Sequence, residues 1–195
     1  MKKILIILVI FVSFFIGFSF FCTQINERVT KYELPQGNLK WSTIYPKNAK
    51  ACFAAAFTDS LGNVEGSYIL NGTSKNENNK LKISLNNNTF SINNVWNSSN
   101  GFQQIILVNK SIPKKFKDSK RAFRRALCKN TKESFILESN YPMTLTSFAY
   151  YCSKYSTEAV YLDMGEFGYG YIKNKPLHIL GLFTKYKQTN WLYIE

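Results

Sequence analysis

Residues 144–163 read TLTSFAYYCSKYSTEAVYLD, and this stretch decides the fold. Its first part carries apolar residues at the spacing of one helical face, after Thr144, a residue type that favours the N-cap. Those apolar residues are Leu145, Phe148, Ala149 and Cys152. We therefore predict a helix over 145–155. The next run, 158–163, is short and apolar, which predicts a buried strand against which the helix packs.

Short alternating or apolar runs on both sides of this unit predict further strands. We expect strands over 50–57, 67–70, 102–108, 126–129, 134–138, 177–183 and 190–194, and a hairpin formed by 80–85 and 89–92. The basic connector 110–120 is expected to be partly helical. We expect 51–57 to lie beside 158–163 in one sheet, because both runs lack a polar face. The fold class is α+β: a mixed, largely antiparallel β-sheet core with one main helix packed on it.

The N-terminus has the layout of an export signal. Lys2 and Lys3 precede the apolar stretch 4–21, long enough either for a signal core or for a short membrane span. The stretch ends in Phe20 and Phe21, whereas a signal peptidase prefers small residues, so we favour an uncleaved anchor. The two lysines stay on the cytoplasmic side and direct the remainder outward. We expect an anchor over 1–22, a linker over 23–40, and one domain over 41–195 on the extracytoplasmic side, in the periplasm or at the cell surface, either membrane-anchored or secreted.

The chain is strongly basic, with a formal net charge of +13. Most basic residues are dispersed, but a cluster runs from Lys114 to Arg125. An exported protein rarely meets chromosomal DNA, so we expect no nucleic-acid partner. A phosphorylated or anionic glycan is a better match for this charge. A solvated basic surface without a specific ligand remains the alternative.

The cysteines and the single histidine show no metal or catalytic pattern. Cys52, Cys128 and Cys152 lack the paired spacing of a zinc site, and they either include one disulfide or remain buried thiols. We interpret His178, between two apolar residues, as a strand residue rather than a ligand. The sequence predicts no metal and names no cofactor.

Three short segments, in order, resemble motifs of a known family. They are Cys52–Thr58, Arg124–Cys128 and Ala159–Phe167, which read CFAAAFT, RRALC and AVYLDMGEF. In these motifs and in the order of its elements, the stretch 41–194 resembles the phosphodiester glycosidase family. The founding activity of that family removes a terminal N-acetylglucosamine from a phosphodiester. The resemblance implies a hydrolase that cleaves the sugar-phosphate linkage of a glycan phosphodiester at the cell envelope.

The last segment also has a physical basis for catalysis. Asp163 ends an apolar strand and enters a glycine-rich loop, a common place for a catalytic carboxylate. Glycoside cleavage uses two carboxyl groups, and Glu166 is the second candidate. The alternative is that Asp163 only binds loop amides.

Other residues are candidates for substrate binding. Arg124 or Arg125 offers the planar fork that binds a phosphodiester oxygen, unless they serve as a structural ion pair and a solvated charge. Tyr169 is a candidate for stacking on a sugar, or for packing. The resemblance adds Gly165 and Phe57 to the substrate-binding set.

The three segments also depart from the family. Alanines replace an Asn-Gly-Gly run in the first, and Met164 and Glu166 replace two glycines in the last, where Phe167 replaces a serine. Lost glycines change how closely the backbone approaches a ligand. Two functions therefore stay open: a divergent hydrolase, or a catalytically inactive envelope-anchored module that binds carbohydrate or a polyanion.

Overall fold

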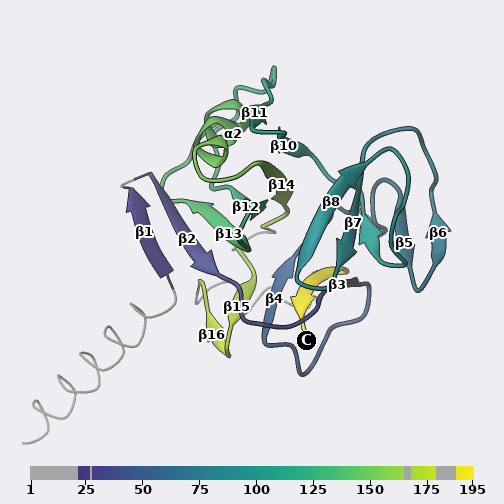
Figure 1. Cartoon of the computed structure of the whole chain (residues 1–195). Helices are drawn as coiled ribbons and strands as arrows, with labels where there is room; N and C mark the ends of the chain where they lie inside the picture. The colour runs from purple at the N-terminus through teal and green to yellow at the C-terminus, as the bar shows by residue number, and fades with distance from the viewer. Residues whose placement is uncertain (1–21, 27, 165–167, 179–187) are drawn as a thin grey trace, which may run out of the picture.

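The computed structural model describes residues 22–26, 28–164, 168–178 and 188–195, which form three β-sheets and one helix, α2 (Figure 1). The first sheet contains, in spatial order, β1 (Cys22–Asn26), β2 (Val29–Glu33), β13 (Ser134–Ser139), β12 (Arg125–Lys129), β14 (Glu158–Leu162), β10 (Ile106–Asn109) and β11 (Ile112–Pro113). The second contains β16 (Lys175–Pro176), β15 (Gly170–Ile172), β4 (Ala51–Ala54), β17 (Trp191–Ile194) and β3 (Leu39–Ser42). The third contains β6 (Thr73–Lys75), β5 (Tyr68–Leu70), β9 (Gly101–Phe102), β7 (Lys82–Asn86) and β8 (Thr89–Asn93).

The predicted fold class is confirmed, because the described strands pair antiparallel and one helix, α2 (Leu145–Ser153), packs on them. Thr144 caps this helix as expected, since its side chain accepts a hydrogen bond from the Ser147 amide. The hairpin of β7 and β8 and the antiparallel pair of β12 and β13 also agree with the sequence pattern.

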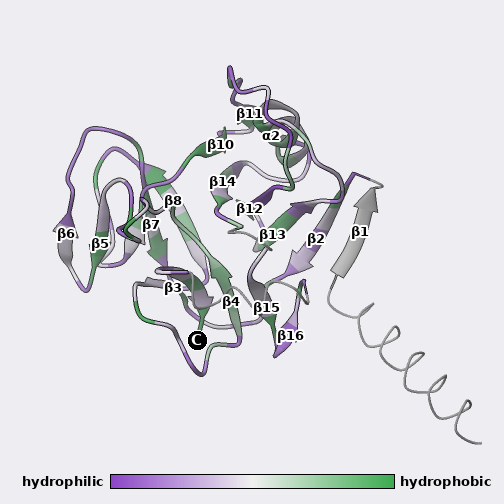
Figure 2. Ribbon diagram, turned by 180° about the vertical axis from the view of Figure 1, so that it is seen from behind, coloured by the Kyte–Doolittle hydropathy of each residue, from purple (hydrophilic) through white to green (hydrophobic). Residues whose placement is uncertain are grey.

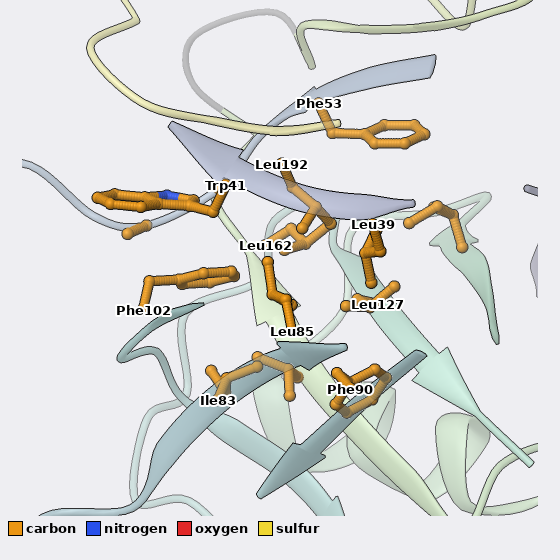
Figure 3. Close-up of a cluster of buried hydrophobic side chains, with 14 of the residues drawn as sticks. Leu39, Trp41, Phe53, Ile83, Leu85, Phe90, Phe102, Leu127, Leu162 and Leu192 are labelled. Atoms are coloured by element: carbon orange, nitrogen blue, oxygen red, sulfur yellow. The ribbon is translucent and has the colours of Figure 1, made fainter. Parts of the chain in front are cut away.

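All three sheets contribute to one hydrophobic core (Figure 3). Leu127 and Leu162 come from the first sheet, Phe53 and Leu192 from the second, and Phe90 from the third. The opposite face of the first sheet packs against the apolar face of α2, which forms a second core. Consecutive residues of β12 and β14 therefore point into different cores. The same alternation determines which face of the sheet each charged side chain at its end occupies.

The expectation that 51–57 and 158–163 share one sheet is wrong. Strand β4 pairs on both sides with β15 and β17, and β14 pairs on both sides with β12 and β10, so neither has a free edge for the other. Beyond the ends of the two strands, the Asp163 amide donates to the Ala55 carbonyl at 2.8 Å. Strand β14 does lie inside its sheet and against α2, as predicted.

The predicted strand 102–108 is divided between two sheets. It contains the end of β9 in the third sheet and most of β10 in the first. Between them, Gln103 and Gln104 are buried, and their side chains bind the backbone of neighbouring segments, including the Ser67 amide and the Ala55 carbonyl. These amide side chains satisfy backbone groups where the chain crosses from one sheet to the next.

Two connecting segments also differ from expectation. The expected linker 23–40 contains β1, β2 and the start of β3, and β2 pairs with β13 in the first sheet, so it belongs to the folded unit. The connector 110–120 is not helical: it carries the short strand β11 and is otherwise extended or irregular. The expected membrane segment 4–21 lies outside the described residues, among which no helix is long and apolar enough to cross a membrane.

Candidate functional site

A buried charged network lies at one end of the first sheet. The Arg125 side chain, fully buried, donates from Nε to the Glu138 carboxylate on the adjacent strand β13. It also donates from Nη1 to the Tyr169 carbonyl at 2.6 Å and from Nη2 to the Gly168 carbonyl at 2.9 Å. Arg125 therefore holds the backbone that follows β14 against the sheet. The contact with Glu138 is the structural ion pair that the sequence analysis gave as the alternative to phosphodiester binding. Because Arg125 is fully buried, it has no surface on which a phosphodiester could bind.

Glu138 is held ionised by this network. Burial alone would raise its pKa, but the positive charge of Arg125 and the hydrogen bond from His178 outweigh burial and keep the pKa of Glu138 below its ordinary value. A buried carboxylate with two such partners is fixed in position and in charge. It can therefore orient a partner that is more exposed.

That partner is His178, whose Nε2 lies 2.8 Å from Glu138 Oε2. The His178 side chain is 42% exposed, whereas that of Glu138 is 4% exposed. The interpretation of His178 as a strand residue is wrong: it lies in a bend after β16, and its ring contacts the network. An imidazole that is accessible to solvent and oriented by a buried carboxylate is suited to proton transfer.

Two glycines allow the backbone to approach this network closely. A Cβ on Gly168, which has a φ of 68°, would lie 2.9 Å from Cδ2 of His178. A Cβ on Gly170 would lie 3.0 Å from the Phe53 ring and 3.1 Å from Nη1 of Arg125. A side chain at either position would therefore push the backbone of residues 168–170 away from His178 and Arg125, so both positions require glycine.

Arg124 points to the opposite face of the sheet, towards α2. Its Nη2 donates to the Lys120 carbonyl at 2.8 Å and lies 3.4 Å from the Asp118 carboxylate, and its guanidinium lies 5.8 Å from the centre of the Tyr161 ring. The two arginines thus serve different surroundings and do not form one clamp. Arg124 is mostly buried, and its contacts connect the basic connector to the end of β14.

Asp163 directly follows β14, and its charge acts on the Tyr161 side chain. Burial, together with the negative charge of nearby Asp163, raises the pKa of the Tyr161 phenol against the opposing effect of Arg124. Asp163 is half-buried, and its amide is fixed by the Ala55 carbonyl. Because Arg125 pairs in register with both Leu162 and Glu138, Asp163 and the Glu138–His178 pair lie at the same end of the sheet.

The other predicted site residues lie in different places. Phe57 is half-buried with its ring 5.5 Å from that of Tyr161, which places it beside Asp163. Tyr169 is fully buried and its hydroxyl bonds with that of Tyr45 at 3.0 Å, so it packs inside the protein and offers no face to a sugar. Gly165 and Glu166 lie outside the described residues.

Cys52, Cys128 and Cys152 are buried free thiols, which confirms one of the two alternatives that the sequence left open. Cys128 and Cys152 belong to the core between the first sheet and α2, and Cys52 lies on the outer face of the second sheet. Within the described ranges, no three His, Cys, Asp or Glu side chains gather where they could hold a metal ion.

Comparisons with known proteins agree with this architecture. No protein-family profile and no curated protein sequence matches the chain. Among solved structures, it is similar to the catalytic domain of zebrafish N-acetylglucosamine-1-phosphodiester alpha-N-acetylglucosaminidase, auto-inhibited by its pro-peptide. The match has a TM-score of 0.58 and 12% sequence identity, and covers 86% of this chain and 76% of the other. The resemblance found in the sequence is thereby confirmed at the level of the fold.

Proposed function

We propose that this chain hydrolyses the bond between a sugar and phosphate in a glycan phosphodiester, and that it does so on the extracytoplasmic side of a membrane, anchored through residues 4–21. The fold that it shares with a phosphodiester glycosidase domain supports this reaction class. The observation that carries the proposal is local: a half-buried carboxylate, Asp163, and a carboxylate-bound imidazole, His178, adjoin the same end of one sheet.

The reaction needs two kinds of assistance. One group attacks the anomeric carbon or activates water for that attack, and another assists the departure of the leaving oxygen. Asp163 takes the first role, because a carboxylate at a strand end can be fixed by its backbone while its side chain meets the substrate. His178 takes the second role, since Glu138 orients its ring and the exposed part of the ring can give a proton to the phosphate oxygen.

Arg125 acts as a positioning residue in this scheme. It is too buried to touch a substrate, but it holds the carbonyls of Gly168 and Tyr169 and the carboxylate of Glu138. The backbone after Asp163 and the carboxylate that orients His178 are thereby fixed by one guanidinium.

The first experiment is a substrate panel. The purified full chain is incubated with sugar-1-phosphodiesters of both anomeric series, and the released reducing sugar is measured. We expect release from at least one member, and release slower by roughly 100-fold or more from the Asp163→Asn variant purified in the same way, which controls for contaminating hydrolases. Calorimetric binding of the same compounds without release from any of them would instead favour the inactive binding module.

Replacing His178 by Gln tests its proton-transfer role. Gln can still bond with Glu138 but cannot carry a proton. The expected loss in turnover is modest, about tenfold, because a phosphate leaving group has a second pKa of about 6 and departs with little protonation. Unchanged turnover with normal thermal unfolding would remove His178 from the reaction.

A further inference from the structure

One surface segment is far more basic than the rest of the protein. Residues 110–121, which we call the basic strap, contain six exposed basic residues: Lys110, Lys114, Lys115, Lys117, Lys120 and Arg121. Its one acidic residue, Asp118, contacts Arg124. Within the described part of the chain, no carboxylate forms an ion pair with any of the six, whereas Lys31 and Lys129 each pair with a glutamate. The positive charge of the strap is therefore uncompensated.

The backbone of the strap is nevertheless held in place. The Lys114 amide donates to the Leu107 carbonyl at 2.8 Å, and the Phe116 amide donates to Thr146 Oγ1 of α2 at 2.8 Å. Thr146 Oγ1 donates in return to the Phe116 carbonyl at 3.1 Å, and Ala122 forms a bridge with Met143. Because the backbone is ordered before any ligand arrives, binding along the strap costs less conformational entropy.

The strap leads to the candidate site. Its Lys120 carbonyl accepts a hydrogen bond from Arg124, whose guanidinium lies against the Tyr161 ring two residues before Asp163. Figure 2 shows this hydrophilic connection between β11 and β12, next to α2 and the first sheet. A chain-like ligand that follows the strap therefore arrives beside Asp163.

We propose that the basic strap is a binding surface for a polymer with repeated phosphodiester groups, which it delivers to the site at Asp163. The choice of phosphodiesters rests on the proposed function. A single sugar phosphodiester carries one charge and does not require six cations. The ten residues 112–121, which follow the turn of the β10–β11 hairpin, span at most about 35 Å, a length that several successive charges of a polymer can match. Such contacts release counterions, so this binding is salt-dependent.

The test compares two triple variants of the full chain that remove the same charge. One variant replaces three strap residues by Gln: Lys114, Lys115 and Lys117. The other replaces three exposed lysines elsewhere by Gln: Lys47, Lys75 and Lys80. The probe is fluorescent poly(glycerol phosphate), which has phosphodiesters but no sugar-phosphate bond to hydrolyse. We expect the strap variant to bind about tenfold more weakly than the parent, with a salt slope reduced by roughly 2–3. The second variant should bind like the parent.

Each other outcome overturns the proposal. Equal losses in both variants would assign binding to the general charge of the protein. Polyglutamate bound as tightly, with the same dependence on the strap, would show that phosphodiesters are not recognised. A strap effect seen only with phosphatidylglycerol vesicles would assign it to a membrane, which exposed Ile112 and Phe123 would also contact.

Hydrolysis is measured separately, so that the two proposals can fail separately. The strap variant should hydrolyse a monomeric sugar-1-phosphodiester as fast as the parent. If neither protein hydrolyses it but the polymer still binds along the strap, the proposed function fails and strap binding stands.

Discussion

Replacing Asp163 by Asn is expected to lower the turnover of a sugar-1-phosphodiester by roughly 10²-fold or more, the usual scale for loss of an acid or base. Asn keeps the shape of the side chain but removes its charge. The fold should survive, because the Asp163 backbone is held by the Ala55 carbonyl independently of the side chain. The measurement is kcat for the best compound of the substrate panel, together with the melting temperature.

Asp118→Asn is the matched control for this prediction. The Asp118 carboxylate lies on the exposed basic strap and contacts Arg124, whose guanidinium lies over the Tyr161 ring, so its replacement removes an equal charge near the same end of β14. We expect its turnover to stay within a factor of about two of the parent, because Arg124 keeps its hydrogen bonds to the Lys120 and Met143 carbonyls without Asp118. Equal losses in the two variants would show that the effect comes from the loss of local negative charge, and would count against Asp163 as the catalytic carboxylate.

Asp163→Ala separates catalysis from a role in the loop. If Asp163 only caps loop amides, Asn would still accept their hydrogen bonds and retain full activity, whereas Ala would lower the melting temperature. That pattern would end the catalytic assignment and leave Glu166 as the next carboxylate to replace.

The local elements of this fold could be predicted from the sequence because their signals are local. The helix α2 has both an apolar face and a capping residue, and the hairpin β7–β8 has alternation and a turn rich in asparagine. Sheet membership could not be predicted in the same way. Strands β4 and β14 both read as buried runs, but three sheets share one core, so burial does not reveal which strands pair.

The candidate site was found only in part for a related reason. Asp163 follows a strand and was visible in the sequence. The pair Glu138 and His178 is formed by residues 40 positions apart, which no local pattern connects. One signal was available: Glu138 occupies a core-facing position of an apolar strand, where a charge requires a buried partner.

Arg124 and Arg125 illustrate how strand geometry divides adjacent residues. Successive side chains of an extended chain point to opposite faces, so Arg125, the first residue of β12, and Arg124, which precedes it, enter different environments. Arg125 enters the network with Glu138, and Arg124 contacts the strap and Tyr161. The alternation itself would have excluded a clamp formed by both.

Replacing Arg125 by Met is expected to destabilise the protein by about 3–5 kcal/mol, because it leaves the Glu138 charge buried without its cationic partner. The carbonyls of Gly168 and Tyr169 would lose their donors as well. The measurement is the free energy of unfolding in urea at neutral pH. Arg121→Met is the control: Arg121 is exposed, and its replacement should change stability by no more than about 0.5 kcal/mol.

The pH dependence of stability provides an independent check on the same network. The folded pKa of Glu138 is lowered, so its contribution is present above the ordinary pKa of a glutamate, about 4.3, and is lost as the pH falls from there through the lower folded value. In Glu138→Gln this acid-dependent loss should be smaller, although the variant is less stable at neutral pH.

Because the charge of Glu138 is stabilised mainly by Arg125, the combined variant Arg125→Met with Glu138→Gln should be less destabilised than the sum of the two single variants. Strict additivity, with an unchanged acid limb in Glu138→Gln, would mean that the two side chains do not form a coupled pair in solution, and Arg125 could not then be the residue that positions the site.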